Sequence, residues 1–289
     1  MEIIRIPRIM QDIARTHKMH NKRIGFVPTM GSLHEGHLSL VRMARTENEI
    51  TVASIYVNPK QFGPTEDLSQ YPRDIEGDAE KLTGEGIDIL FLPVDSLIYP
   101  DGFSTRVEVE GLSRKLCGAY RRGHFSGVAT VVTKLFNLIG PARAYFGQKD
   151  FQQTVIIKRM VKDLDMDIDI VVCPTIREED GLAMSSRNLY LTREQRGAAA
   201  IIYKCLNEAS GAIKSGIIKV TELKKLMETR LASEPLVSEI QYCSAYDPGT
   251  LDELEEIANE ALLAIALKVG ETRLIDNILV AAGQKSSSP

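Results

Sequence analysis

Two histidines, His34 and His37, stand three residues apart and directly follow a turn rich in small and polar residues. After them Leu38, Val41 and Ala44 recur at helical spacing, which predicts a helix that carries both imidazoles on one face of its first turn. A helix N-terminus has partial positive charge and unpaired N–H groups, so it favours an anion. The pattern predicts a phosphate site in which the rings donate to phosphate oxygens, although two surface histidines on an ordinary helix would share this spacing.

The turn before the histidines, residues 28–33, joins a predicted buried strand over residues 24–27 to this helix. Gly31 and Ser32 have small side chains, so backbone N–H groups of the turn can approach a ligand closely. Gly36, between the histidines, removes a side chain from the place where a ligand would sit. We therefore expect the strand, the turn and the helix N-terminus to form one anion site.

Lys149 stands at a second junction of the same kind, between a predicted strand over residues 142–146 and a predicted helix that runs to residue 164. An ammonium group there could neutralise the charge that develops on an α-phosphate when a nucleotidyl group is transferred. A solvent-exposed lysine is the alternative for any single lysine.

Two amide side chains, Asn58 and Gln61, follow a further predicted strand over residues 50–57. We expect both at the ligand edge of the sheet, where amides can bind hydroxyl and carboxylate groups without bringing charge. A capped turn explains Asn58 equally well, because it precedes a proline.

Two hydroxyls and a guanidinium group follow one another at Ser185, Ser186 and Arg187, in a glycine-containing loop that we expect to be mobile. The serines can donate to a triphosphate from the side, and arginine forms a two-pronged fork with phosphate. A solvated serine-arginine loop is the alternative.

Asp74 and Asp78 flank the start of a predicted helix over residues 75–83. A carboxylate there could help to bind magnesium, but acidic residues at the start of a helix are more often partners of its dipole. The metal ligands are therefore unknown, with Asp78 as the candidate.

Strands and helices alternate over the first part of the chain, which predicts a parallel sheet with right-handed crossovers. Ligands of such sheets lie beyond the carboxyl ends of the strands. We expect an α/β domain over residues 1–175 and a smaller α+β domain, which carries the serine-arginine loop, over residues 176–289. The second domain is predicted to contain two helices and three short strands, over residues 193–214, 220–232, 237–245, 262–269 and 272–275.

The composition excludes several classes of function. The chain has 289 residues, with 35 Lys plus Arg against 39 Asp plus Glu, a net charge of −4. Broad nucleic-acid binding needs many cationic contacts, so this balance argues against it. Four widely spaced cysteines are typical of reduced packing residues, and no apolar run approaches a membrane span. We expect a cytoplasmic protein with no nucleic-acid partner and no membrane segment.

The string His34, Glu35, Gly36, His37 is similar to the H-x-G-H signature of the nucleotidyltransferase superfamily. The longer string from residue 28 to residue 37 resembles the pantothenate synthetases specifically. Three further strings resemble that family in the same order: Asn-Pro-x-Gln-Phe from Asn58, Gly-x-Lys-Asp-x-x-Gln from residue 147, and Met-Ser-Ser-Arg from residue 184. The resemblance covers nearly the whole chain.

This resemblance implies a Rossmann-like first domain, a homodimer and a two-step ligase. In that reaction the pantoate carboxylate attacks Mg²⁺-bound ATP to give pantoyl adenylate and pyrophosphate, and β-alanine then displaces AMP. It implies that His34, His37 and Lys149 are catalytic, that Gln61 and Gln153 bind pantoate, and that no tightly bound organic cofactor is needed. The ATP contacts that it implies are Met30, Gly31, Ser32, Leu33, His34, Glu35, Gly36, His37, Gly147, Gln148, Lys149, Asp150, Ile176, Met184, Ser185, Ser186 and Arg187.

Two other functions remain open at this point. A cytidylyltransferase would use the same phosphate site, although the amides of Asn58, Gln61 and Gln153 favour a small polar acid as substrate. A nucleotide sensor on the same fold would bind ATP without turnover.

Overall fold

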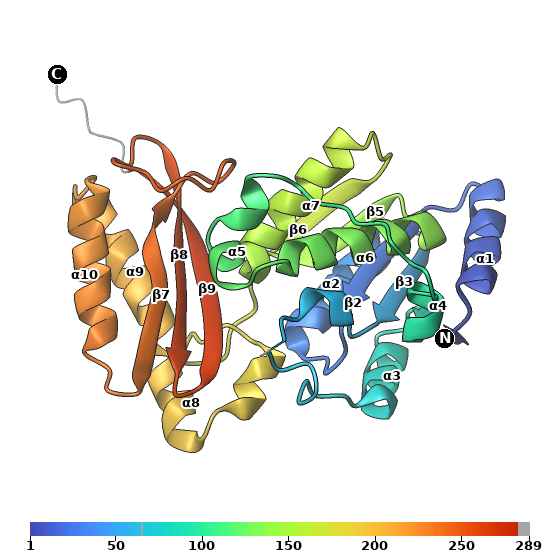
Figure 1. The fold of residues 1–289 in the computed structure, drawn as a ribbon, viewed down its shortest axis with the longest axis horizontal. Coiled ribbons are helices and arrows are strands. Elements are labelled where there is room, and N and C mark those ends of the chain that lie inside the picture. The colour runs from blue at the N-terminus through green and yellow to red at the C-terminus, as the bar shows by residue number, and fades with distance from the viewer. Residues whose placement is uncertain (65, 283–289) are drawn as a thin grey trace. The chain divides into compact units, whose positions relative to one another are not determined.

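The computed structural model describes residues 1–64 and 66–282 (Figure 1). Over this range the chain divides into two compact units. The first comprises residues 1–114 and 121–176, and the second comprises residues 115–120 together with the chain from residue 177 onward. Within the described part of the chain, no helix combines the length and the apolar character needed to cross a bilayer.

A six-stranded sheet forms the centre of the first unit, in the order β1-β4-β3-β2-β5-β6, with every neighbouring pair parallel. This confirms the predicted α/β class. The strands are β1 (Glu2–Ile4), β2 (Ile24–Thr29), β3 (Ile50–Ile55), β4 (Ile89–Phe91), β5 (Arg143–Gly147) and β6 (Asp169–Cys173).

Helices cover both faces of this sheet, which explains why all six residues of β3 are buried. The helices α1, α6 and α7 pack together on one face, and α2 and α3 pack on the other, against a core that includes Val27, Val41 and Leu82 (Figure 1). The helical segments are α1 (Pro7–Met19), α2 (Glu35–Glu47), α3 (Ile75–Gly84), α4 (Asp95–Ile98), α6 (His124–Ile139) and α7 (Phe151–Asp163), with short 3-10 turns η1 (Pro59–Gln61), η2 (Leu112–Arg114) and η3 (Gln148–Asp150).

The direction of winding reverses between β2 and β5, which are neighbours in the sheet. From β2 the chain proceeds to β3 and β4 on one side, and from β5 to β6 on the other. The crevice outside the carboxyl ends of such a pair is where ligands bind in open α/β sheets. The histidine turn follows β2 and the Lys149 segment follows β5, so both candidate phosphate-binding segments leave the sheet at this switch point.

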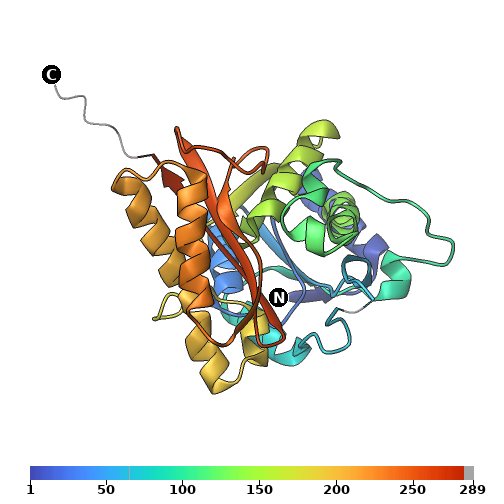
Figure 2. The same cartoon turned by 60° about the vertical axis from the view of Figure 1, so that its left-hand side comes forward.

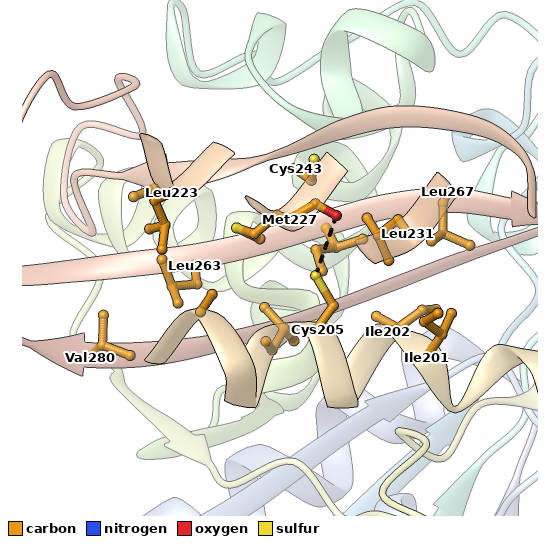
Figure 3. Close-up of a cluster of buried hydrophobic side chains, with 14 of the residues drawn as sticks. Ile201, Ile202, Cys205, Leu223, Met227, Leu231, Cys243, Leu263, Leu267 and Val280 are labelled. Carbon is orange, nitrogen blue, oxygen red and sulfur yellow. Dashed lines mark hydrogen bonds between the residues drawn. The ribbon is translucent and has the colours of Figure 1, made fainter. Parts of the chain in front are cut away.

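The second unit is a three-stranded antiparallel sheet, β7 (Val237–Tyr246), β8 (Glu260–Val269) and β9 (Thr272–Ala281), packed against helices. Helices α9 (Ile201–Lys214) and α10 (Val220–Ala232) lie side by side on one face of this sheet (Figures 1 and 2), and α8 (Arg193–Ala199) precedes them. Cys205, Leu223, Met227 and Cys243 meet in its core (Figure 3). All four cysteines are buried and none of them forms a disulfide within the described part of the chain, in agreement with the prediction of packing residues.

The short helix α5 (Cys117–Tyr120) and the segment before it, which contains Lys115, belong to the second unit although they lie between segments of the first. The Lys115 ammonium donates to the Asp252 carboxylate at 2.6 Å, and the Cys117 thiol lies 3.0 Å from the Tyr242 hydroxyl. A single boundary near residue 176 therefore does not describe how the chain is divided between the units.

Candidate active site

The histidine turn has a backbone that its glycine makes possible. Gly31 has φ +87°, and a Cβ atom there would lie 3.1 Å from both a carboxylate oxygen of Asp78 and a methyl group of Ile55. Ser32, the next residue, also has a positive φ of 51°. The turn is therefore tightly folded between β3 and the start of α3.

Asp78 holds this turn in place from α3. Its side chain is fully buried, and its two oxygens accept the backbone N–H groups of Ser32 and Leu33, each at 2.7 Å. Lys81, one helical turn further on, donates to the Leu33 carbonyl at 2.9 Å and lies 3.6 Å from the Asp78 carboxylate. The buried carboxylate, which we considered for magnesium, thus sets the shape of the turn.

The expectation that backbone N–H groups of the turn face a ligand is wrong for Ser32 and Leu33, because Asp78 takes both. The Gly31 N–H donates to the Thr29 hydroxyl at 3.2 Å, and the His34 N–H donates to His37 Nδ1 at 3.4 Å. At the start of α2, the N–H groups of His37 and Leu38 donate to the His34 carbonyl, so the two N–H groups before them are the ones left to an anion.

Asp74 is the N-cap of α3, where its carboxylate accepts the Gly77 N–H at 3.0 Å. This confirms the helix-start alternative for Asp74. Among residues 1–64 and 66–282 there is no group of three or more histidine, cysteine, aspartate or glutamate side chains arranged to hold a metal ion.

Removing one oxygen of the Asp78 carboxylate should loosen the turn. In Asp78→Asn one of the two buried N–H groups loses its acceptor, which costs about 1–3 kcal/mol of the free energy of unfolding. We expect chemical denaturation to show this loss and ATP binding to weaken. Asp74→Asn is the matched control, because asparagine caps a helix about as well as aspartate. Equal stability of the two variants would contradict the role of Asp78.

The rings of His34 and His37 lie with their centroids 4.1 Å apart and their planes tilted by 38°. Because His37 Nδ1 accepts the His34 N–H, the proton of a neutral His37 ring is on Nε2. His34 Nδ1 is buried and finds no hydrogen-bond partner among the described residues. Each ring thus has a nitrogen that the turn itself does not use.

Both rings are held in the neutral form. Burial, and then the nearby positive charge of Lys149, lower the pKa of His34 to about 4. Burial and the neighbouring His34, Lys149 and Lys81 lower the pKa of His37 well below its ordinary value. At neutral pH the pair therefore offers uncharged N–H donors, and the lysines supply the positive charge.

The depressed pKa of His34 predicts how stability depends on pH. The unfolded chain takes up a proton near pH 6.5 and the folded chain only near pH 4, so the contribution of His34 is complete above pH 6.5 and is lost as the pH falls towards 4. A difference of one in pKa between the folded and unfolded chain corresponds to about 1.4 kcal/mol. Urea unfolding at pH 7.5 and pH 5 should show a smaller pH dependence for His34→Gln than for the unchanged protein. An NMR titration of His34 with a midpoint near 6.5 would contradict this.

Lys149 lies in η3, directly beyond β5, and its charge acts on both histidine rings. The structure therefore brings His34, His37 and Lys149 together at the switch point, as the sequence predicted. Gln153 follows in the first turn of α7. Its neighbour Gln152 is buried and donates to the Leu112 carbonyl at 2.9 Å, so it has a structural role.

Gln61 ends the 3-10 turn η1 and reaches the histidine turn, because its Nε2 lies 2.9 Å from the Met30 sulfur. Asn58 does not reach the ligand edge as predicted. It is 1% exposed, its Oδ1 accepts the Lys60 N–H, and its Nδ2 donates to Gln61 Oε1 at 3.1 Å. The capped-turn alternative is thus the correct one for Asn58.

His124, the first residue of α6, and Arg121, just before the helix, support the backbone of Gln61. His124 Nδ1 donates to the Gln61 carbonyl at 2.8 Å, and Arg121 bonds His124 at 3.1 Å while pairing with Glu66. A Cβ atom on Gly127 would lie 2.2 Å from the Lys60 carbonyl oxygen, so only glycine allows this helix to approach η1 so closely. Sequence reasoning missed the pair between Arg121 and Glu66, because the two are 55 residues apart.

The serine-arginine loop belongs to the second unit and has a defined conformation there. Ser185 caps the 3-10 turn η4 (Ser186–Tyr190) by accepting the Arg187 N–H at 3.3 Å, and Ser186 is buried. Before it, Arg177 forms a two-pronged ion pair with Asp276 and lies 3.9 Å from the centre of the Tyr203 ring. Arg177 thus connects the chain just before this loop to β9.

The comparisons with known proteins agree with one another. A family model described as pantoate-beta-alanine ligase matches residues 2–279. The chain is 58% identical over 280 residues to a pantothenate synthetase of Thermodesulfovibrio yellowstonii, covering 97% of this chain and 100% of the relative. A crystal structure of pantothenate synthetase from Thermus thermophilus superposes with a TM-score of 0.91 at 44% identity, over 96% of this chain and 99% of that one. A pantoate-beta-alanine ligase from Francisella tularensis, complexed with beta-gamma ATP and beta-alanine, superposes with a TM-score of 0.80 at 36% identity, over 96% and 97%.

Proposed function

This chain belongs to the pantoate-beta-alanine ligase family, and from that premise we propose that it joins pantoate to β-alanine at the expense of ATP. The observation that carries the proposal is the meeting of two neutral imidazoles and Lys149 at the switch point of the sheet. A site of this kind binds a polyphosphate through uncharged donors and balances its charge with an ammonium group. The ATP and β-alanine bound by the Francisella tularensis relative support the same substrates here.

The proposed reaction has two steps, with magnesium entering as part of the ATP substrate. A pantoate carboxylate oxygen attacks the α-phosphorus of ATP, the bond to the pyrophosphate oxygen breaks, and pantoyl adenylate forms. The amine of β-alanine then attacks the acyl carbon, loses a proton, and AMP leaves with the acyl C–O bonding pair. Catalysis comes from orientation and charge stabilisation.

The pKa values of three of the four cysteines support storage of the activated acyl group on the substrate and not on a thiol. Burial raises the pKa of Cys173, and it raises the pKa of Cys205 and Cys243 to about 12. These groups stay as thiols, and the thiol form is a poor nucleophile. A mixed anhydride of pantoate and AMP needs no such side chain.

The residues singled out above have the following proposed roles in this reaction. His34 and His37 donate to the phosphates, Lys149 stabilises charge on the α-phosphate, and Gln61 and Gln153 bind pantoate. The resemblance alone supports Asp150 at the ribose and Met184, Ser185, Ser186 and Arg187 of the second unit at ATP. The homodimer and the cytoplasmic location also stay predictions, and sedimentation would test the first of them.

Incubation with ATP and pantoate alone tests the function. The ligase should release pyrophosphate without CTP and should form pantothenate once β-alanine is added. A cytidylyltransferase would need CTP, and a sensor would bind ATP without releasing pyrophosphate. Either of these results would overturn the proposal.

A further inference from the structure

A chain of hydrogen bonds leads from the hydroxyl of Tyr99 through the amide of Asn58 to the amide of Gln61. Tyr99 Oη lies 2.9 Å from Asn58 Oδ1, and Asn58 Nδ2 lies 3.1 Å from Gln61 Oε1. We infer that Tyr99 is a positioning residue, which completes the hydrogen bonds of Asn58 and through Asn58 holds the Gln61 amide with its NH₂ group available to the substrate. The inference rests on the proposed role of Gln61 in binding the acid substrate.

Two backbone groups fix the orientation of the Asn58 amide. The Lys60 N–H, 3.3 Å away, can only donate, so it must face the oxygen of the amide. The Gly127 carbonyl, 3.1 Å away, can only accept, so it must face the nitrogen. A flipped amide would place donor against donor and acceptor against acceptor in a site where Asn58 is 1% exposed.

This orientation determines the two remaining bonds of Asn58. The second N–H of Asn58 points at Gln61, which must accept this hydrogen bond with its amide oxygen. The second lone pair of the Asn58 oxygen is filled by the Tyr99 hydroxyl, which must donate because an amide oxygen can only accept. All four bonding positions of the Asn58 amide are then used.

Gln61 is left with its NH₂ group on the side of Met30, whose sulfur lies 2.9 Å from Nε2 and is a weak acceptor. The group that Gln61 offers to a substrate is therefore a donor. It suits a carboxylate or hydroxyl oxygen, both of which pantoate has, and it cannot serve the ammonium group of β-alanine. The hydrogen-bond chain thus favours an oxygen-bearing acid over an amine at this position.

The surroundings of Tyr99 keep its hydroxyl protonated and its ring in place. Burial, and then the charge of Asp95, raise the pKa of the Tyr99 hydroxyl, so it remains a donor throughout the working pH range. The Phe103 ring packs against the Tyr99 ring, with 5.0 Å between their centroids, and the Lys60 ammonium lies 4.9 Å from the centre of the Tyr99 ring. Phenylalanine at this position keeps the ring contacts and removes only the hydrogen bond.

The test uses Tyr99→Phe, with labelled pyrophosphate exchange into ATP as the readout. We expect the pantoate concentration for half-maximal exchange to rise about three- to tenfold, the effect of one hydrogen bond, while the ATP requirement stays the same. Tyr56→Phe is the matched control, since it removes a hydroxyl from the ring whose centroid lies 6.4 Å from that of Tyr99. The control should leave the pantoate requirement unchanged.

A double-mutant cycle with Gln61→Leu separates positioning from general support. If Tyr99 acts through Gln61, Tyr99→Phe should have no further effect on the pantoate requirement once Gln61 is leucine. An equal effect of Tyr99→Phe in the unchanged protein and in the Gln61→Leu variant would overturn the inference. So would a lower melting temperature of Tyr99→Phe together with a matching rise in its ATP requirement. If the unchanged protein shows no pantoate-dependent exchange, the proposed function fails instead.

Discussion

The variant His37→Ala should form pantoyl adenylate about a hundredfold more slowly or worse, which is the usual effect of losing one donor to the transition state. The neutral His37 ring carries its proton on Nε2, because Nδ1 accepts the His34 N–H, and so it can donate to a phosphate oxygen as charge develops there. Single-turnover measurement of adenylate formation from ATP and pantoate, with enzyme in excess, gives this rate directly.

The control for this experiment is His20→Ala. His20 is exposed at the end of α1, where its ring bonds the Thr16 carbonyl, so it should affect neither adenylation nor melting temperature. His37→Ala should also melt at nearly the normal temperature, because Asp78 and not the histidine pair holds the turn. Adenylation by His37→Ala at a near-normal rate would remove His37 from the mechanism.

The position of the site could be predicted because its signal is local. A strand, a small-residue turn and a helix N-terminus follow one another within about fifteen residues around His34, and a second such junction carries Lys149. Both junctions had to reach the same edge of a parallel sheet, since the carboxyl ends of parallel strands lie together. Long helices and buried strands were predicted for the same reason, from periodicity within one segment.

The support of the site could not be predicted, because it depends on contacts between distant segments. Asp78 and Ser32 are 46 residues apart, and nothing near either residue specifies that pair. Asn58 is bonded by Tyr99 and Gly127, which lie on other elements. The strand β1 was missed because its three residues show no periodicity.

Lys149→Ala should abolish exchange of labelled pyrophosphate into ATP, measured with pantoate present and β-alanine absent. The Lys149 charge acts at the two imidazoles, where negative charge on the α-phosphate is expected to build during the first step. With no acyl-carrying side chain in the proposed mechanism, activation is stored as a mixed anhydride that forms before the amine is needed. Exchange in the unchanged protein should therefore not require β-alanine.

The second half-reaction gives the comparison that assigns the role of Lys149. Capture of preformed pantoyl adenylate by β-alanine should be much less affected by Lys149→Ala, because an interaction made mainly in the first transition state accelerates only that step. Lys158→Ala, which removes an exposed lysine from the same helical region, is the matched control and should leave both rates unchanged. Equal damage to both half-reactions would make Lys149 a general binding residue, and exchange that appears only with β-alanine would favour concerted ligation.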